Sequence, residues 1–389
     1  MTATLTRGVP ARRGWAERLD AATPAYRDRT VDALRAIAML GVVLGHWLVS
    51  ALVADPSRAG VVTNHSPLSG WPAAAPASWF LQLLGPFFFA GGYAAALGSR
   101  GRPALPWLRG RVRRLVLPVA VLAAVFVPVF AGLRFAGVPG PTRHVVWSLV
   151  SHPMWFLLVY LVLTMLTPVL RRLTVRCGLW WLVPLVGAVG LVDTMRPAGL
   201  PTAVAVAVVP VGWAIPYVAG IALAEGRLTD RAGALLVPAG VALGAALVAS
   251  GYPASAVGVP GDGWSNLDPP SLFAVALAAV QIGLFLLVRS RLRALLRRPA
   301  AWAPVAVANL VALTVFCWHQ SALLAVSFAA LPFGAVPGLL GPVGGAWLAW
   351  RLLWCPVFAA VLVGLCLLFR RAERLGRRRQ DGSSAKMVQ

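Results

Sequence analysis

The sequence predicts an all-α polytopic membrane helix bundle of about ten transmembrane helices, with both termini in the cytoplasm. Hydrophobic residues make up 59% of the 389 residues and charged residues only 12%, which is too apolar a balance for a soluble chain of this length. Apolar segments recur at lengths near the ~20 residues that a helix needs to cross the hydrocarbon, and arginine-rich runs separate them. The chain is therefore expected to lie in a lipid bilayer.

The predicted helices cover, in order, residues 31–54, 79–98, 115–136, 154–170, 179–193, 202–224, 233–251, 269–288, 301–325 and 343–369. The fourth and fifth are short, and Pro168, Cys177, Gly178 and Pro184 interrupt this part of the chain. One of the two could be kinked or re-entrant, because broken helices are tolerated where they line a cavity.

The distribution of arginine predicts the orientation. Connections on one side hold most of the 35 Lys and Arg residues, whereas the opposite side keeps only Arg58, Arg134, Arg143, Arg196 and Arg351. This positive-inside pattern predicts an even number of helices. The protein is expected to be a multi-pass protein of the cell membrane, which would be the cytoplasmic membrane of a bacterium. The net charge of +23 does not indicate a nucleic-acid partner, because the arginines do not form one basic face with interleaved aromatic residues.

Three parts of the chain are expected. Residues 1–30 form a cytoplasmic Arg-rich segment, residues 31–370 form the transmembrane domain, and residues 371–389 form a basic, disordered cytoplasmic tail. The outer loops 55–78 and 252–268 are rich in Pro, Gly and Ser, and they are long enough to fold over the entrance of a site.

Several kinds of chemistry find no support in the sequence. The four cysteines include no CxxC pair and the five histidines have no metal-ligand spacing, so no disulfide framework and no metal site is predicted. The sequence also lacks a Walker loop, a GxGxxG fingerprint and a GxSxG elbow, which argues against ATP, dinucleotide and serine-hydrolase chemistry.

The first predicted helix carries charged and titratable residues. An unpaired ionisable group costs several kcal/mol inside a membrane unless it faces protein or water. Arg35 and His46 are eleven residues apart, so they lie on one helix face, about 16 Å apart along the axis. Asp32 joins the same stripe. Arg35 could instead be a topogenic charge at the membrane edge, His46 an interhelical hydrogen bonder and Asp32 a simple cap.

The residues TVDALRAIAMLGVVLGHW (30–47) resemble the first helix of acyltransferase family 3, whose signature is a basic residue, ten residues and then a histidine. Four further segments are similar to the family in its own order: GPFFFAGGY (85–93), RVRRLVLP (111–118), MWFLLVYLVLTMLTPVL (154–170) and WHQS (318–321). Gly92 and Tyr93 depart from the Ser-Gly-Phe of many members, and the esterase-like domain fused to some members does not occur in this sequence.

The resemblance implies an integral membrane acyltransferase. It would move an acyl group, most often acetyl, from acetyl-CoA or another acyl-CoA to a hydroxyl of a sugar, polysaccharide, lipid or natural product. The main alternative is a secondary transporter or exporter of a glycan, lipid or small molecule, in which Arg35 and His46 would form a relay. A transporter should show a trail of Asp and Glu through the bundle, and here acidic residues fall almost only at segment ends.

Roles follow for the candidate residues. His46 is the predicted general base, because imidazole with its ordinary pKa of about 6.5 can take a hydroxyl proton near neutral pH. Arg35 is predicted to bind phosphate or the pantetheine arm of the donor. Asp32 is counted with His46 among the catalytic residues, with the role of orienting Arg35. Arg111, Arg113 and Arg114 form a second donor-binding candidate, with Arg114 favoured because it lies nearest the apolar boundary.

On the acceptor side, the candidates are His319, Trp155 and Tyr93, although each could be a packing residue. Asn309 and Gln281 are polar residues within apolar helices, and they are expected to join helices by hydrogen bonds.

Overall fold

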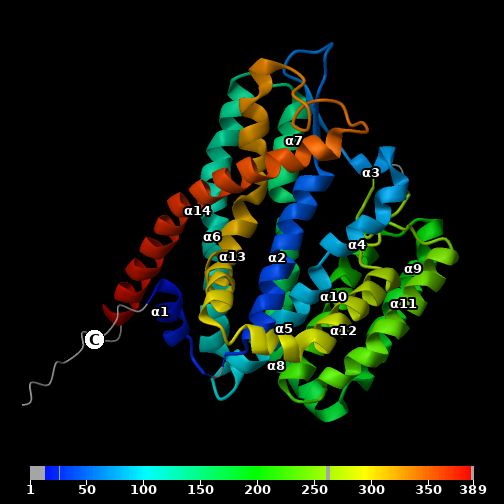
Figure 1. Ribbon diagram of the computed structural model, residues 1–389, viewed down its shortest axis with the longest axis vertical. Coiled ribbons are helices and arrows are strands. Elements are labelled where there is room, and N and C mark those ends of the chain that lie inside the picture. The colour runs from blue at the N-terminus through cyan, green and yellow to red at the C-terminus, as the bar shows by residue number, and fades with distance from the viewer. Residues whose placement is uncertain (1–13, 26, 260–262, 387–389) are drawn as a thin grey trace, which may run out of the picture.

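A computed structural model describes residues 14–25, 27–259 and 263–386, with side chains up to residue 370. It confirms the all-α membrane fold (Figure 1). Nine helical stretches of the described chain are long and apolar enough to cross a membrane. Many of their large apolar side chains face outward, most of all on α6, α11 and α14, as expected for a surface that contacts lipid.

The helices are α1 (Trp15–Ala21), α2 (Arg29–Val49), α3 (Pro67–Gly70), α4 (Ser78–Leu81), α5 (Leu84–Ser99), α6 (Ala104–Phe135), α7 (Gly140–Ser151), α8 (Met154–Cys177), α9 (Val183–Met195), α10 (Thr202–Ala224), α11 (Gly233–Ala249), α12 (Leu272–Leu295), α13 (Pro299–Ala329) and α14 (Trp347–Lys386). Five short 3-10 helices connect them: η1 (Pro72–Ala77), η2 (Trp180–Leu182), η3 (Arg196–Ala198), η4 (Asp230–Ala232) and η5 (Leu331–Phe333). Strands β1 (Ala51–Ala54) and β2 (Val62–His65) form one antiparallel hairpin.

Helix α2 runs through the middle of the bundle, between α5 on one side and α13 on the other (Figure 1). Its first turn is capped by Asp28, whose carboxylate accepts hydrogen bonds from the N–H groups of Thr30 and Val31. Its last turn ends at Ser50, whose N–H donates to the carbonyl of His46. The predicted extension of this helix to residue 54 is wrong, because residues 51–54 pair as β1 with β2.

Helices α5 and α10 cross with their backbones in contact. A Cβ atom placed on Gly92 would lie 1.9 Å from the carbonyl oxygen of Tyr217, and one on Gly220 would lie 1.9 Å from that of Phe89. Neither position can hold a larger residue without separating the two helices. Close packing of α5 against α10 therefore explains why position 92 of the GPFFFAGGY segment is a glycine.

The region between α8 and α10 differs from the two similar spans that were predicted. Helix α8 is continuous through Pro168 and ends at Gly178, which has a positive φ of 64°. Helix α9 has only 13 residues, so it is about 20 Å long, shorter than the hydrocarbon. Arg171 of α8 pairs with Glu225 at the end of α10, so both helices end on the same side. Because α8 and α10 both run toward that side, the chain between them, which includes α9, crosses back to the opposite side of the bundle.

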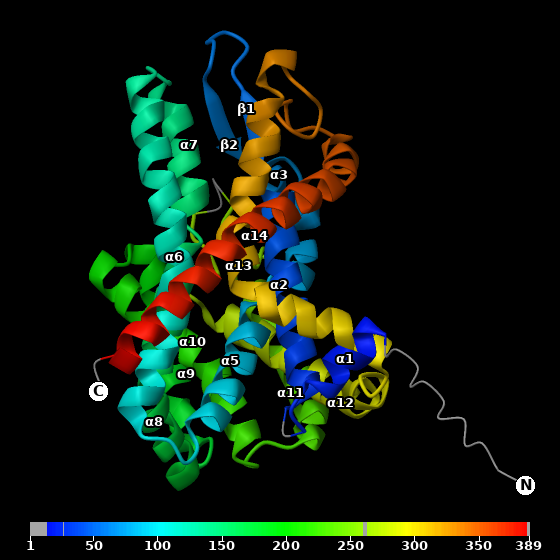
Figure 2. The same ribbon diagram turned by 90° about the vertical axis from the view of Figure 1, so that its left-hand side faces the viewer.

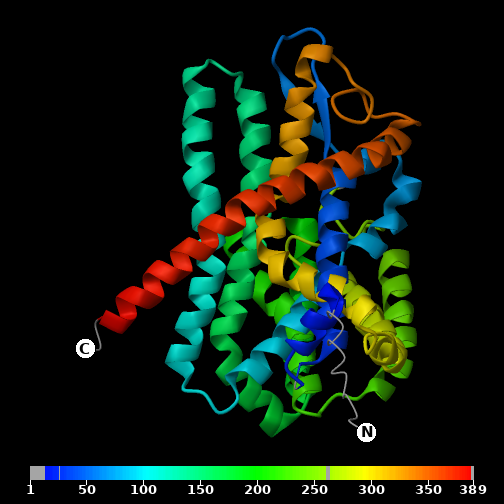
Figure 3. The same ribbon diagram turned by 60° about the vertical axis from the view of Figure 1, so that its left-hand side comes forward.

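Helix α14 crosses α13 and α6 obliquely (Figures 2 and 3). Its backbone is helical as far as Lys386, through the segment that was expected to be disordered. Residues 371–386 include no proline, and Leu, Arg, Gln and Ala favour helix, so the transmembrane helix can propagate outward. The remaining tail residues, 387–389, and the predicted N-terminal segment up to residue 13 lie outside the described residues.

Candidate active site

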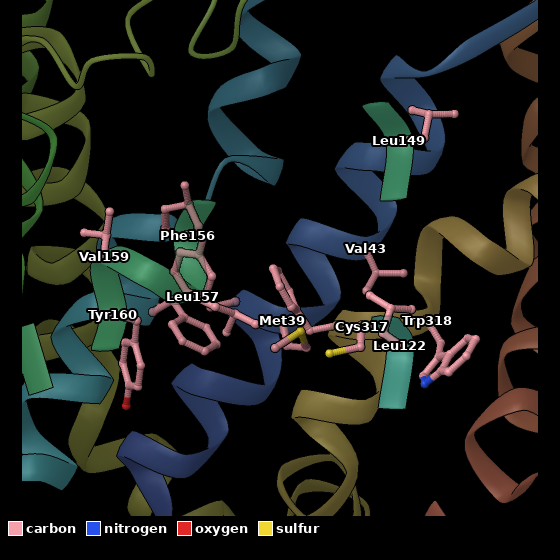
Figure 4. Packing of buried hydrophobic residues seen from close by; sticks show 14 of the residues in the cluster. Met39, Val43, Leu122, Leu149, Phe156, Leu157, Val159, Tyr160, Cys317 and Trp318 are labelled. Atoms are coloured by element: carbon pink, nitrogen blue, oxygen red, sulfur yellow. The ribbon is translucent and has the colours of Figure 1, made fainter. Parts of the chain in front are cut away.

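The candidate site lies where α2 and α13 face each other. The ring centroids of His46 and His319 are 5.0 Å apart, and Trp47 donates a hydrogen bond of 2.9 Å to the carbonyl of His319. In the hydrophobic cluster around α2, Phe156 and Tyr160 of α8 lie on one side of this helix, and Cys317 and Trp318 of α13 lie on the other (Figure 4). Helix packing thus brings together two histidines that are 273 positions apart in the sequence.

The hydrogen bonds of His319 define its tautomer. Its Nδ1 lies 2.6 Å from the carbonyl oxygen of Phe316, so Nδ1 carries the proton that is donated. In the neutral ring, Nε2 is then an acceptor, and it is fully buried without a hydrogen-bond partner among the described residues. A buried acceptor of this kind can receive a proton or a hydroxyl group.

Gln320 contacts the other histidine. Its amide nitrogen lies 3.4 Å from Nδ1 of His46, and its amide oxygen is buried and finds no partner in the part of the chain that the structure describes. The two ends of a glutamine amide are assigned from the surrounding hydrogen bonds. With the oxygen turned toward His46, Nδ1–H donates to Gln320 and Nε2 is free to act as a base.

Two cavities meet at His46. The larger, of about 790 Å³, is the more polar of the two and is called the polar cavity below. Its walls include Asn64, His65, Ser148, His152, Arg196 and Asp268 from the predicted outer loops and their neighbours. The smaller, of about 230 Å³, is apolar and lies between α2, α3, η1, α4 and α8. Trp155 lines both cavities. The role of Trp155 toward the acceptor stays a prediction.

Arg35 lies at the other end of α2 and is held by two groups. Its Nε donates to Asn309 Oδ1 at 2.5 Å, and its Nη2 donates to Asp32 Oδ1 at 3.2 Å. The amide of Asn309 also donates to the carbonyl of Asp32 at 2.8 Å. Asn309 therefore joins α13 to α2 by hydrogen bonds, as the sequence predicted. Gln281 does the same for α12, because its amide donates to the carbonyls of Trp79 and Gln82.

Asp32 does not belong to the catalytic centre. It pairs with Arg27 and Arg35, and it is 14 residues from His46, or about 20 Å along the helix. Asp32 therefore contacts Arg35 and makes no direct contact with His46.

Of the three predicted donor-binding arginines on α6, Arg111 contacts α5. It donates to the carbonyl of Ala94 at 3.2 Å and its guanidinium lies over Trp107. Arg113 is partly buried and Arg114, which was favoured, is exposed.

Tyr93 was predicted on the acceptor side, and this prediction is wrong. Its hydroxyl donates to Asp28, the N-cap of α2, at the opposite end of the helix from His46. Asp28 also accepts from Arg289 at 2.6 Å. Burial alone would raise the pKa of Asp28, but hydrogen bonds from Thr30 and Arg289 outweigh burial and keep this pKa below its ordinary value. Tyr93 is therefore part of an ionic network that anchors the first helix.

Two residues of the site were missed by the sequence reasoning. His152 lines both cavities beside His46, although no role was predicted for it. Gln320 was included in the WHQS segment but received no role. The sequence marks them only by position, because Gln320 lies inside the WHQS segment and His152 lies two residues before Met154. Their approach to His46 depends on how α7, α8 and α13 pack. Among the described residues, no group of three or more His, Cys, Asp or Glu could hold a metal ion.

A known protein family matches this chain over most of its length. The family model described as an acyltransferase domain, acyltransferase family 3, matches residues 28–370. The match covers the whole bundle from the cap of α2 to the membrane-spanning part of α14. The chain therefore belongs to this family of membrane acyltransferases. Comparisons with curated proteins and with solved structures gave no match.

Proposed function

We propose that this protein is an acyl-CoA-dependent O-acyltransferase, with His46 as its general base. The acyl group, acetyl as the commonest choice, is transferred to a hydroxyl of a sugar, polysaccharide, lipid or natural product. The observation that carries the proposal is the position of His46, which lies beside a second histidine and where a polar and an apolar cavity meet. Membership of an acyltransferase family supplies the reaction class.

The reaction joins the acceptor oxygen to the acyl carbon. Nε2 of His46 takes the hydroxyl proton as the oxygen attacks the thioester, the C–S bond breaks, and the CoA thiolate leaves. The proton on His46 then passes to this thiolate, which gives free CoA thiol and restores the neutral base. In this mechanism the Gln320 amide, whose nitrogen lies 3.4 Å from His46 Nδ1, turns so that its oxygen accepts from Nδ1–H and leaves Nε2 for the acceptor. His319 packs beside the ring of His46.

The two substrates approach from opposite sides in this proposal. The acceptor occupies the polar cavity among the outer loops, where several hydroxyl, imidazole and carboxylate groups can bind it. The donor enters from the cytoplasm, and its phosphates or amides bind Arg35, whose guanidinium is already oriented by Asp32 and Asn309. About 16 Å separates Arg35 from His46 along α2, a distance that an extended pantetheine arm must cover.

The test uses membranes that contain the full chain and radiolabelled acetyl-CoA. Ester-linked label in the membrane extract and free CoA thiol are measured together. His46→Ala is expected to lose about 10²- to 10⁴-fold in rate, the usual contribution of a general base, while His319→Ala loses less and mainly in acceptor use. His144→Ala is the matched control, because His144 is exposed on α7.

Two results would contradict the proposal. More than about a tenth of the wild-type rate in His46→Ala would limit its contribution to about 1.4 kcal/mol, too little for an essential base. Uptake or efflux without any loss of the thioester would instead support the transporter alternative. Stable label on His46 without acceptor would support a covalent acyl-histidine variant of the mechanism.

The membrane location has its own test. Because most arginines lie in alternate connections, reporter fusions after Arg29, Arg114 and Arg298 should report the cytoplasm of a bacterial cell. A fusion near Ser66 should report the outside. A cytoplasmic signal at Ser66 would contradict both the orientation and the outer position of the polar cavity.

A further inference from the structure

The apolar cavity beside His46 has no role in the steps above. It measures about 230 Å³, and its walls include Val42, Gly45 and Leu48 of α2 and Phe316 of α13. One water molecule needs only about 10–15 Å³ of such space, so the cavity is more than tenfold larger than a water site. Its walls are mostly hydrocarbon and offer water few hydrogen bonds. Cavities of this kind stay dry or bind apolar ligands.

The position of this cavity indicates which ligand it binds. It shares His46, Val49 and Trp155 with the polar cavity, so the two spaces meet at the proposed base. A thioester carbonyl held at His46 therefore borders both cavities. The attacking hydroxyl belongs to the polar side. The hydrocarbon part of the acyl group then fits the apolar side.

We propose that this apolar cavity is an acyl-chain pocket, and that the protein binds acyl-CoA donors with aliphatic chains longer than acetyl. This inference rests on the proposed function. The single methyl group of an acetyl donor would leave most of the pocket empty, and an empty apolar pocket loses the dispersion contacts of its lining. Burial of one methylene group corresponds to a gain of about fourfold in affinity.

Residues that line only the apolar cavity set the chain length. Leu68 of α3 and Ala74 of η1 line the apolar cavity, and neither lines the polar one. A larger side chain at Ala74 shortens the pocket, and a smaller one at Leu68 lengthens it. The loop between β2 and α5 therefore determines donor specificity, while the histidines of α2 and α13 determine the chemistry.

The experiment measures donor binding, which requires no acceptor. Purified full-length protein in detergent binds radiolabelled acetyl-CoA, and unlabelled acetyl-, butanoyl-, hexanoyl- and octanoyl-CoA compete for the site. Wild type should bind the competitors about fourfold more tightly for each added methylene until the chain fills the pocket. Ala74→Leu should move the optimum to a shorter chain, and Leu68→Ala should move it to a longer one.

A matched control separates this pocket from general effects of detergent. Ala325→Leu fills a different apolar cavity, of about 460 Å³, between α6, α7 and α13, and should leave the chain-length profile unchanged. The same profile in all four proteins would overturn the proposal and assign the pocket to a bilayer lipid or to the tail of the acceptor. Acetyl-CoA as the tightest competitor would also overturn it. A protein that binds no acyl-CoA would contradict the proposed function itself.

Discussion

Replacement of Asn309 by alanine tests how the protein holds its donor. The side chain accepts from Arg35 Nε at 2.5 Å and donates to the carbonyl of Asp32 at 2.8 Å. A hydrogen bond to a charged group contributes about 1.5–3 kcal/mol, so the loss should weaken donor interaction about tenfold to 100-fold. In steady-state assays the donor KM should rise by this factor, while the acceptor KM changes little, because the polar cavity lies at the other end of α2.

Gln281→Ala is the matched control for this change. Gln281 also joins helices through its amide, with 2.9 Å hydrogen bonds to the carbonyls of Trp79 and Gln82, but these partners are uncharged. Both variants should lower the thermal midpoint in detergent, and only Asn309→Ala should raise the donor KM selectively. Equal increases in both KM values, or the same kinetics in both variants, would refute the role of Asn309 in orienting Arg35.

Three further outcomes are expected. Gln320→Ala should lower kcat about tenfold with little change in either KM, because His46 keeps its imidazole but loses the group that orients it; an unchanged kcat would contradict this. Asp28→Asn should destabilise the protein above the ordinary pKa of 3.8, and the difference from wild type should shrink as pH falls through the lowered pKa of Asp28, as thermal unfolding against pH would show. Gly220→Ala should destabilise the protein by about 1–3 kcal/mol because its Cβ meets the backbone of α5, whereas Gly187→Ala, with open space around it, should not.

The sign of the Asp28 prediction follows from its pKa. A carboxyl group whose pKa is lower in the folded than in the unfolded protein binds fewer protons when folded. It therefore stabilises the fold fully above about pH 3.8 and loses this contribution as the pH falls further. A difference between Asp28→Asn and wild type that stayed constant down to pH 2 would show that Asp28 acts by a contact that does not depend on its charge.

Local features of the sequence determined the membrane class and the order of the helices, and they marked Arg35 and His46 as candidates. These features depend on composition, segment length and helical spacing, which act over a few turns of one chain segment. The amides of Asn309 and Gln281 could be predicted as helix-joining groups for the same reason, since a polar side chain in an apolar helix needs a partner.

The tertiary structure alone decided which partners meet. The approach of His319 and Gln320 to His46 and the meeting of two cavities at that residue depend on how α2, α8 and α13 pack. Tyr93 shows that the sequence could not place a side chain along α2, because the crossing of α5 brings its hydroxyl to Asp28 at the opposite end of α2 from His46. Side chains hundreds of residues apart meet through helix packing, which follows from the summed contacts of whole helix faces and leaves no signal in the spacing of any one segment.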